Sequence, residues 1–126
     1  MKLLLAVALG GAVGALARFF CTNMFAKALG AGFPYGTLFV NVAGSFAMAV
    51  VVELLAAKLS AHSELRAFLA VGLLGSFTTF SSFSHEVATL YERGHMLAAG
   101  GYIGASPSMS LIALFSGLWV TRAFLA

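Results

Sequence analysis

Four apolar stretches run along the chain, each long enough to cross the roughly 30 Å hydrocarbon core of a bilayer as a helix. Only short connectors separate these stretches, which leaves no room for a soluble catalytic domain. The pattern therefore predicts an all-α integral membrane protein in which residues 1–126 form a single transmembrane domain. The four predicted transmembrane helices span residues 3–25, 34–57, 67–90 and 96–119.

Polar residues interrupt the second and fourth stretches at helical spacing. In each stretch they stand at i, i+4 and i+8, so they form one polar stripe along an otherwise apolar helix. A polar side chain that faces lipid is costly, so each stripe either bonds a neighbouring helix or faces a polar path. A serine stripe can also bond only the carbonyls of its own helix. The stripes are Thr37, Asn41 and Ser45 in the second stretch, and Tyr102, Ser106 and Ser110 in the fourth.

The third stretch turns polar in mid-membrane, at residues 75–86, which read GSFTTFSSFSHE. Gly75 is flexible, and the pair Thr78 and Thr79 carries side chains that compete for backbone hydrogen bonds. We therefore expect the helix to break near residues 75–79. Unwound backbone at membrane depth has to be enclosed by protein, and its free carbonyls can then hold a cation.

Beyond the expected break, hydroxyl groups and phenylalanine rings share the helix surface. Such a surface makes poor lipid contact but suits a narrow conduit, in which hydroxyl groups replace part of the water shell of an ion. Ring edges are electropositive and can lie against an anion. Hydroxyls and amides also bind cations, however, so polarity leaves the sign of the ion open. The polar face comprises Thr79, Ser82, Phe83 and Glu86, and the aromatic edge comprises Phe77, Phe80 and Phe83.

Small residues mark the first stretch. Gly10 and Gly14 stand four positions apart, and Ala6 and Arg18 extend the same face. Small residues at this spacing let helix backbones approach closely in lipid, so we expect this face to pack against another helix. Arg18 can either reach the membrane surface with its long side chain or lie buried against a partner helix.

The composition agrees with a membrane protein. The chain is 61% hydrophobic and 9% charged, with a mean hydropathy of +1.01, whereas a soluble domain carries about 25% charged residues. A single cysteine, Cys21, excludes an intramolecular disulfide, and no Cys/His cluster suggests a metal site. We expect no nucleotide or nucleic-acid partner, because the sequence contains no nucleotide motif.

The basic residues divide almost evenly between the two sides of the membrane. With four helices, the N-terminus, the second loop and the C-terminus share one side, and the first and third loops share the other. Orientation follows the Lys/Arg bias of short loops, and four against three is too weak to select one orientation. We therefore expect insertion in both orientations and an antiparallel homodimer with its two-fold axis in the membrane plane. The first side holds Lys2, Lys58, Arg66 and Arg122, and the second holds Arg18, Lys27 and Arg93.

The segment GSFTTFSSFSHE, with GLL before it and YERG after it, resembles the signature of the Fluc (CrcB) fluoride channels. The similarity extends over essentially the whole chain and includes GGAVGALARF, PYGTLFVNVAGSF and the Tyr–Ser–Ser stripe. The resemblance implies a fluoride-specific ion channel and not an enzyme, with passive F⁻ export through two antiparallel pores of a dual-topology homodimer in the bacterial inner membrane. It also implies a structural Na⁺ at the dimer centre, not transported, held by the backbone carbonyls of Gly75 and Thr78.

The same resemblance implies roles for the polar and aromatic positions. Phe80 and Phe83 correspond to the pore phenylalanines, contributed to each pore by opposite subunits, and Asn41 corresponds to the pore asparagine. The other positions of the implied ion pathway are Tyr102, Ser106 and Ser110 in the polar track, Glu86 at a pore end, Arg18 in the first helix, and Thr79 and Ser82 on the pore face. Pro107 departs from the family pattern, and it predicts a kink that shifts the serines on either side of it.

Three alternative hypotheses have less support. A proton-coupled small multidrug exporter also has four helices and dual topology, but it relies on a buried glutamate in the first helix, which has no acidic residue here. An intramembrane hydrolase using His85 and Glu86 lacks the second histidine of HExxH, and adjacent residues point to different helix faces. A scaffold of packed helices explains the glycines but leaves the polar stripes without a purpose.

Overall fold

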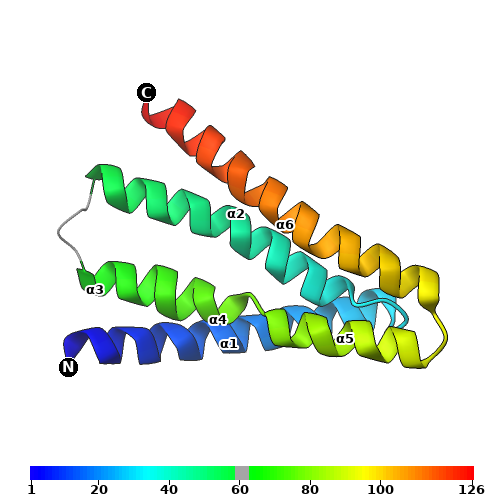
Figure 1. The fold of residues 1–126 in the computed structure, drawn as a ribbon. Helices are drawn as coiled ribbons and strands as arrows, with labels where there is room; N and C mark the ends of the chain where they lie inside the picture. The colour runs from blue at the N-terminus through cyan, green and yellow to red at the C-terminus, as the bar shows by residue number, and fades with distance from the viewer. Residues whose placement is uncertain (59–62) are drawn as a thin grey trace.

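The computed structural model is all-helical and describes residues 1–58 and 63–126 (Figure 1). Four helical segments of the described chain are long and apolar enough to cross a membrane, which confirms the predicted class of fold. In chain order the elements are α1 (Lys2–Leu29), α2 (Tyr35–Lys58), α3 (Ser63–Arg66), η1 (Ala67–Leu74), α4 (Gly75–Phe77), α5 (Phe80–Glu92) and α6 (Met96–Leu125).

The helix ends differ from the predicted ranges mainly at their C-termini. The helix α1 continues to Leu29 and α6 continues to Leu125, so both extend past the apolar windows that located them. A helix continues through a polar residue such as Lys27 at the membrane surface as long as its backbone hydrogen bonds are made. The helix α6 also remains helical through Pro107, which therefore does not end the segment.

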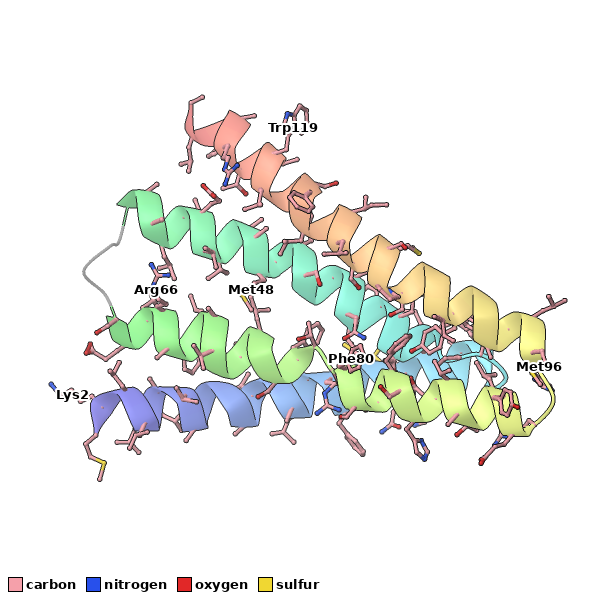
Figure 2. The ribbon with its side chains drawn as sticks, viewed as in Figure 1. Lys2, Met48, Arg66, Phe80, Met96 and Trp119 are labelled. Atoms are coloured by element: carbon pink, nitrogen blue, oxygen red, sulfur yellow. The ribbon has the colours of Figure 1, made fainter. Side chains whose placement is uncertain are left out.

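The four membrane-crossing segments alternate in direction, as Figure 1 shows. Both termini lie at the end of the molecule where α2 ends and α3 begins, and the α1–α2 and α5–α6 connections lie at the opposite end. In Figure 2, Lys2 and Arg66 mark the first end and Met96 marks the second. The helix α2 packs along α6, and α1 packs along η1 and α4.

The glycines of α1 allow its backbone to touch that of η1. Gly10 and Gly14 are buried, and a Cβ atom added at either position would overlap a backbone carbonyl of η1, from Phe68 or Leu73. The predicted close approach of this face to another helix is therefore confirmed. The helix α6 approaches α2 in the same way, because a Cβ atom at Gly117 would stand 2.7 Å from the carbonyl oxygen of Phe46.

The segment η1 is π-helical and continues directly into α4. The N–H of Gly75 donates to the carbonyl of Ala70, five residues earlier, as in a π-helix. Gly72 and Leu74 of this segment are buried. Nothing in the apolar run AFLAVGLL predicts this widening, because hydrophobic spacing does not distinguish hydrogen bonds four residues apart from those five apart.

Candidate ion pathway

The third membrane-crossing segment contains two extended residues between α4 and α5. Thr78 has φ −85° and ψ 155°, and Thr79 has φ −152° and ψ 125°. The last turn of α4 is closed by the N–H and the hydroxyl of Thr78, which both donate to the carbonyl of Leu74, at 3.2 and 3.1 Å. Figure 2 places Phe80 at the start of α5, near the middle of the molecule.

Asn41 on α2 binds the extended backbone at both of its polar groups. Its Oδ1 accepts a hydrogen bond from the N–H of Thr79 at 2.7 Å, and its Nδ2 donates to the carbonyl of Thr79 at 3.0 Å. The side-chain amide thus replaces the backbone partners that a continuous helix would supply. The hydroxyl of Thr79 accepts from the N–H of Ser82 at 3.2 Å and so caps the start of α5.

Two carbonyl groups beside this gap remain unpaired. The N–H of Thr79, which a helix would donate to Gly75, goes to Asn41, and the N–H of Ser82, which a helix would donate to Thr78, goes to Thr79. Within residues 1–58 and 63–126, the carbonyl oxygens of Gly75 and Thr78 accept no hydrogen bond. Gly75 is exposed and Thr78 is half-buried. Both oxygens therefore keep their full capacity to accept a hydrogen bond or to bind a cation.

Arg18 binds the neighbouring carbonyl of α4. Its Nε donates to the carbonyl of Ser76 at 3.0 Å, and the side chain is half-buried. Because α1 continues to Leu29, Arg18 lies about three helical turns before the end of the helix. Of its two predicted placements, the structure has the one against another helix. Arg18 therefore lies farther from the first loop than the sequence prediction placed it, and the balance of basic residues is four against three with Arg18 and four against two without it.

A pocket of about 220 Å³, here called the inner pocket, lies where α2, α5 and α6 meet at the gap. Phe80 and Phe83 lie at its side with ring centroids 5.4 Å apart; Phe83 is buried, whereas Phe80 is 75% exposed. Among the described residues, Ser110 Oγ is the one buried side-chain polar atom without a hydrogen-bond partner. The inner pocket is lined by Asn41, Ser45, Thr78, Thr79, Phe80, Phe83, Ser106, Pro107 and Ser110.

Glu86 lies beyond Phe83, where two hydroxyl groups bind its carboxylate. Thr37 donates to Oε2 at 2.7 Å, and Tyr102 donates to Oε1 at 2.8 Å. Both donors are buried, Tyr102 completely. Each oxygen of the Glu86 carboxyl group therefore has a hydroxyl donor.

A second pocket, of about 310 Å³, lies on the far side of Glu86 and is here called the outer pocket. It opens at the end of the molecule that carries the α1–α2 connection, and Thr37 and Glu86 are part of its wall. The pair of Glu86 and Tyr102 therefore stands between the two pockets, since the ring of Tyr102 contacts Phe83 of the inner pocket at 4.9 Å. Residues 30–37 make up half of the lining of the outer pocket, and the other half is Thr22, Phe25, Ala26, His85, Glu86, Thr89, Leu90 and Arg93.

The structure gathers most of the predicted pathway residues at these two pockets. The residues around the inner pocket are Asn41, Thr79, Phe80, Phe83, Ser106 and Ser110, and Glu86 and Tyr102 stand at its outer side. Arg18, Ser82 and Tyr102 line neither pocket. The sequence prediction left out Thr37, although its place in the stripe with Asn41 carried the signal.

The chain is similar to known proteins over nearly its whole length. The model of the family described as "CrcB-like protein, Camphor Resistance (CrcB)" matches residues 5–118. A protein of Chelativorans sp. (strain BNC1) named "Fluoride-specific ion channel FluC" is 54% identical over 122 residues, which are 97% of this chain and 98% of that protein. A protein of the same name from Rhodospirillum centenum is 50% identical over 126 residues, all of both chains. A third, from Rhizobium etli (strain CIAT 652), is 48% identical over 117 residues, 93% of this chain and 94% of that protein.

Proposed function

Because the chain belongs to the CrcB-like protein family, we propose that it is a fluoride-specific ion channel that lets F⁻ leave the cell passively. The observation that carries the proposal is the identity of about half of all positions, over nearly the full length, to proteins named as such channels. The two pockets on either side of Glu86 and Tyr102 supply a physical basis for it. The inner pocket lies at the gap between α4 and α5, and the outer pocket is lined by the α1–α2 connection, which lies at one end of the molecule.

The chemistry of the inner pocket suits a small anion. The free hydroxyl of Ser110 is a donor without a partner, and the edges of Phe80 and Phe83 are electropositive. No lysine or arginine lines this pocket, so no fixed positive charge holds the anion, and weak binding at several places is what conduction needs. At the outer side the carboxylate of Glu86 disfavours a long stay of the anion, which promotes release.

The conducting form is an antiparallel homodimer with two pores. Gly75 supports this assembly, because the residue is exposed and its carbonyl accepts no hydrogen bond within the described residues. Lipid cannot satisfy a free carbonyl, and a second protein surface can enclose it. Phe80 supports it as well, since its ring is 75% exposed beside the inner pocket and is available to a pore shared between two subunits. With oppositely inserted copies, each subunit brings one such surface to the two-fold axis.

The backbone carbonyls of Gly75 and Thr78 are the groups of this chain that suit the binding of a structural Na⁺. Both are free of hydrogen bonds within the described residues, and unwound backbone carbonyls are ligands that Na⁺ accepts. In a dimer the same two oxygens from each copy would meet at the centre. Such an ion would hold the two subunits together and would not be transported.

The physiological role follows from the acid–base chemistry of HF. This weak acid crosses lipid as a neutral molecule from an acidic medium and dissociates in the near-neutral cytoplasm, where the anion is trapped. In the bacterial inner membrane a negative cell interior drives F⁻ outward by about 2.3 kcal/mol per 100 mV. A passive pathway is sufficient for export, so neither ATP nor a coupling ion is required.

The proposal is tested with purified full-length protein in liposomes loaded with KF and KCl. When a potassium ionophore balances the charge, a fluoride electrode should record rapid release, and a chloride electrode should record none. Liposomes without protein, and liposomes without the ionophore, serve as controls. Equal release of both anions, or no release of fluoride, contradicts the proposal, and proton-coupled ethidium transport would favour the exporter instead.

A further inference from the structure

Four aromatic rings form a continuous row from the α1–α2 connection to the inner pocket. The rings of Phe33 and Tyr102 meet edge to face, with centroids 5.3 Å apart and planes at 70°. Tyr102 meets Phe83 at 4.9 Å and 65°, and Phe83 meets Phe80 at 5.4 Å. Two of these rings belong to the pathway described above, and Tyr102 binds Glu86, but Phe33 at the outer end of the row has no role so far.

Local structure fixes the position of Phe33. It belongs to the short connection between α1 and α2, which begins with Gly30 in the left-handed region at φ 82°. Its carbonyl accepts from the N–H of Tyr35 at 2.9 Å, and its ring also meets the Tyr35 ring at 4.9 Å. Gly36 anchors the connection, because its Cα can approach α1 where a Cβ atom would stand 2.7 Å from the Cα of Thr22.

The ring of Phe33 covers the outer side of Tyr102. Phe33 lines the outer pocket and packs against the buried cluster that contains Tyr102 and Phe83. Tyr102 is thus held by Phe83 on its inner side, by Phe33 on its outer side and by Glu86 at its hydroxyl. Without the ring of Phe33, Tyr102 would have open space of the outer pocket beside it.

We infer that Phe33 is a positioning residue for ion passage, which keeps the Tyr102 hydroxyl on Glu86 and the Tyr102 ring against Phe83. The inference rests on the proposed channel function and adds a residue to it. Edge-to-face pairs of this kind stabilise one arrangement over others by about two- to tenfold. Loss of the ring would therefore populate Tyr102 conformations in which the carboxylate has lost a donor and the row of ring edges is interrupted.

The experiment compares initial F⁻ efflux from liposomes that contain the wild type, Phe33→Leu and Phe33→Tyr. We expect Phe33→Leu to reduce the rate about two- to tenfold and Phe33→Tyr, which keeps the ring, to stay within about twofold of the wild type. Phe33→Met, closer in volume to phenylalanine, replaces the leucine variant if that variant is not recovered folded. Phe39→Leu is the matched control, since it removes a ring at the same end that pairs with Phe25 at 5.0 Å and lines neither pocket.

A double-mutant cycle with Tyr102→Leu, which removes both the hydroxyl and the ring, separates positioning from general packing. If Phe33 acts through Tyr102, Phe33→Leu should slow efflux less than about twofold in the Tyr102→Leu background, whereas independent packing losses would multiply. The inference is overturned if the two effects multiply, if Phe33→Leu releases F⁻ at the wild-type rate, or if Phe39→Leu slows efflux equally. In each case F⁻ release by the wild-type protein would still support the channel function. A wild type that releases no F⁻ would instead overturn the proposed function and the inference with it.

Discussion

Asn41 shows how one side chain can stabilise a gap in a membrane helix. Its amide presents an acceptor and a donor side by side, and both face the backbone of a single residue, Thr79. Its place in the polar stripe of α2 indicated a partner, but it left open whether that partner was another helix or a polar path. The structure shows a partner on the third membrane-crossing segment, and it also places Asn41 in the lining of the inner pocket, so a role in a polar path stays a prediction.

Replacement of Asn41 should destabilise the protein. Asn41→Leu leaves the N–H and the carbonyl of Thr79 without partners, and each unsatisfied group costs about 1–3 kcal/mol. We expect a lower midpoint of thermal unfolding, measured by size-exclusion chromatography of heated samples in detergent. Asn23→Leu is the matched control, since Asn23 is exposed on α1 and should leave the midpoint nearly unchanged. Equal midpoints for the two variants would contradict this role of Asn41.

The two pocket phenylalanines should matter for flux more than for assembly. Phe80→Ile and Phe83→Ile keep an apolar side chain but remove the electropositive ring edge, so we expect F⁻ efflux to fall about fivefold or more in each. Size-exclusion chromatography should show the same elution volume as for the wild type, because the substitutions leave the assembly intact. Efflux at the wild-type rate in both variants would exclude these rings from the pathway.

Residue identity alone could indicate the pathway but not its internal contacts. The stripes on α2 and α6 pointed to Asn41, Ser106 and Ser110, because a helical repeat of polar residues is visible in one sequence. The binding of Glu86 by Thr37 and Tyr102 joins three different helices, and no local pattern encodes it. Phe33 lies in a connection without periodicity, so only the folded chain reveals its contact with Tyr102.

At the scale of helices, α1 and η1 approach each other closely enough for their backbones to touch. Gly14→Ala should disrupt this contact, because the added Cβ would overlap the backbone of Leu73, which cannot rotate away. We expect a loss of about 2 kcal/mol or more, measured as a lower midpoint of thermal unfolding. Gly11→Ala is the matched control on the same helix, since its Cβ would meet only the Ser76 hydroxyl, at 3.3 Å. A midpoint for Gly14→Ala at or above that of Gly11→Ala would contradict the assigned contact.

The residue types of the third segment predicted where its helix is interrupted, but they did not predict its detailed geometry. The run of glycine, serine and threonine led us to expect a break within residues 75–79, and the helical structure stops at Phe77 and resumes at Phe80. The π-helical widening of η1 was not predicted, nor was the bond from Arg18 to Ser76. Both depend on how α1 lies against this segment, which is a property of the packed molecule.

At the scale of the whole molecule, the proposed antiparallel dimer requires that copies insert in both orientations. The bias of the basic residues depends on whether Arg18, which lies against α4, is counted with the first loop. The excess on one side is one or two of the seven basic residues, which is too small to select one orientation.

The orientation can be measured with single cysteines in a Cys21→Ser background. A membrane-impermeant maleimide should label about half of a His95→Cys variant in intact cells and all of it after permeabilisation. His95 is exposed at the α5–α6 connection, and Ala126→Cys, at the opposite end, should also be labelled by half. Complete labelling of one variant and none of the other would show a single orientation and would exclude the antiparallel dimer.

The hydrogen bonds between Asn41 and Thr79 have a consequence for biogenesis. A ribosome makes Asn41 before it makes Thr79, so the amide is already in the bilayer when the interrupted segment leaves the insertion machinery. The peptide groups of Thr79 can then exchange water for Asn41 directly, without waiting unpaired among acyl chains. If the gene were rearranged so that α2 came after α5, Asn41 would be synthesised after Thr79. The product would then depend for a longer time on the machinery that inserts it into the membrane.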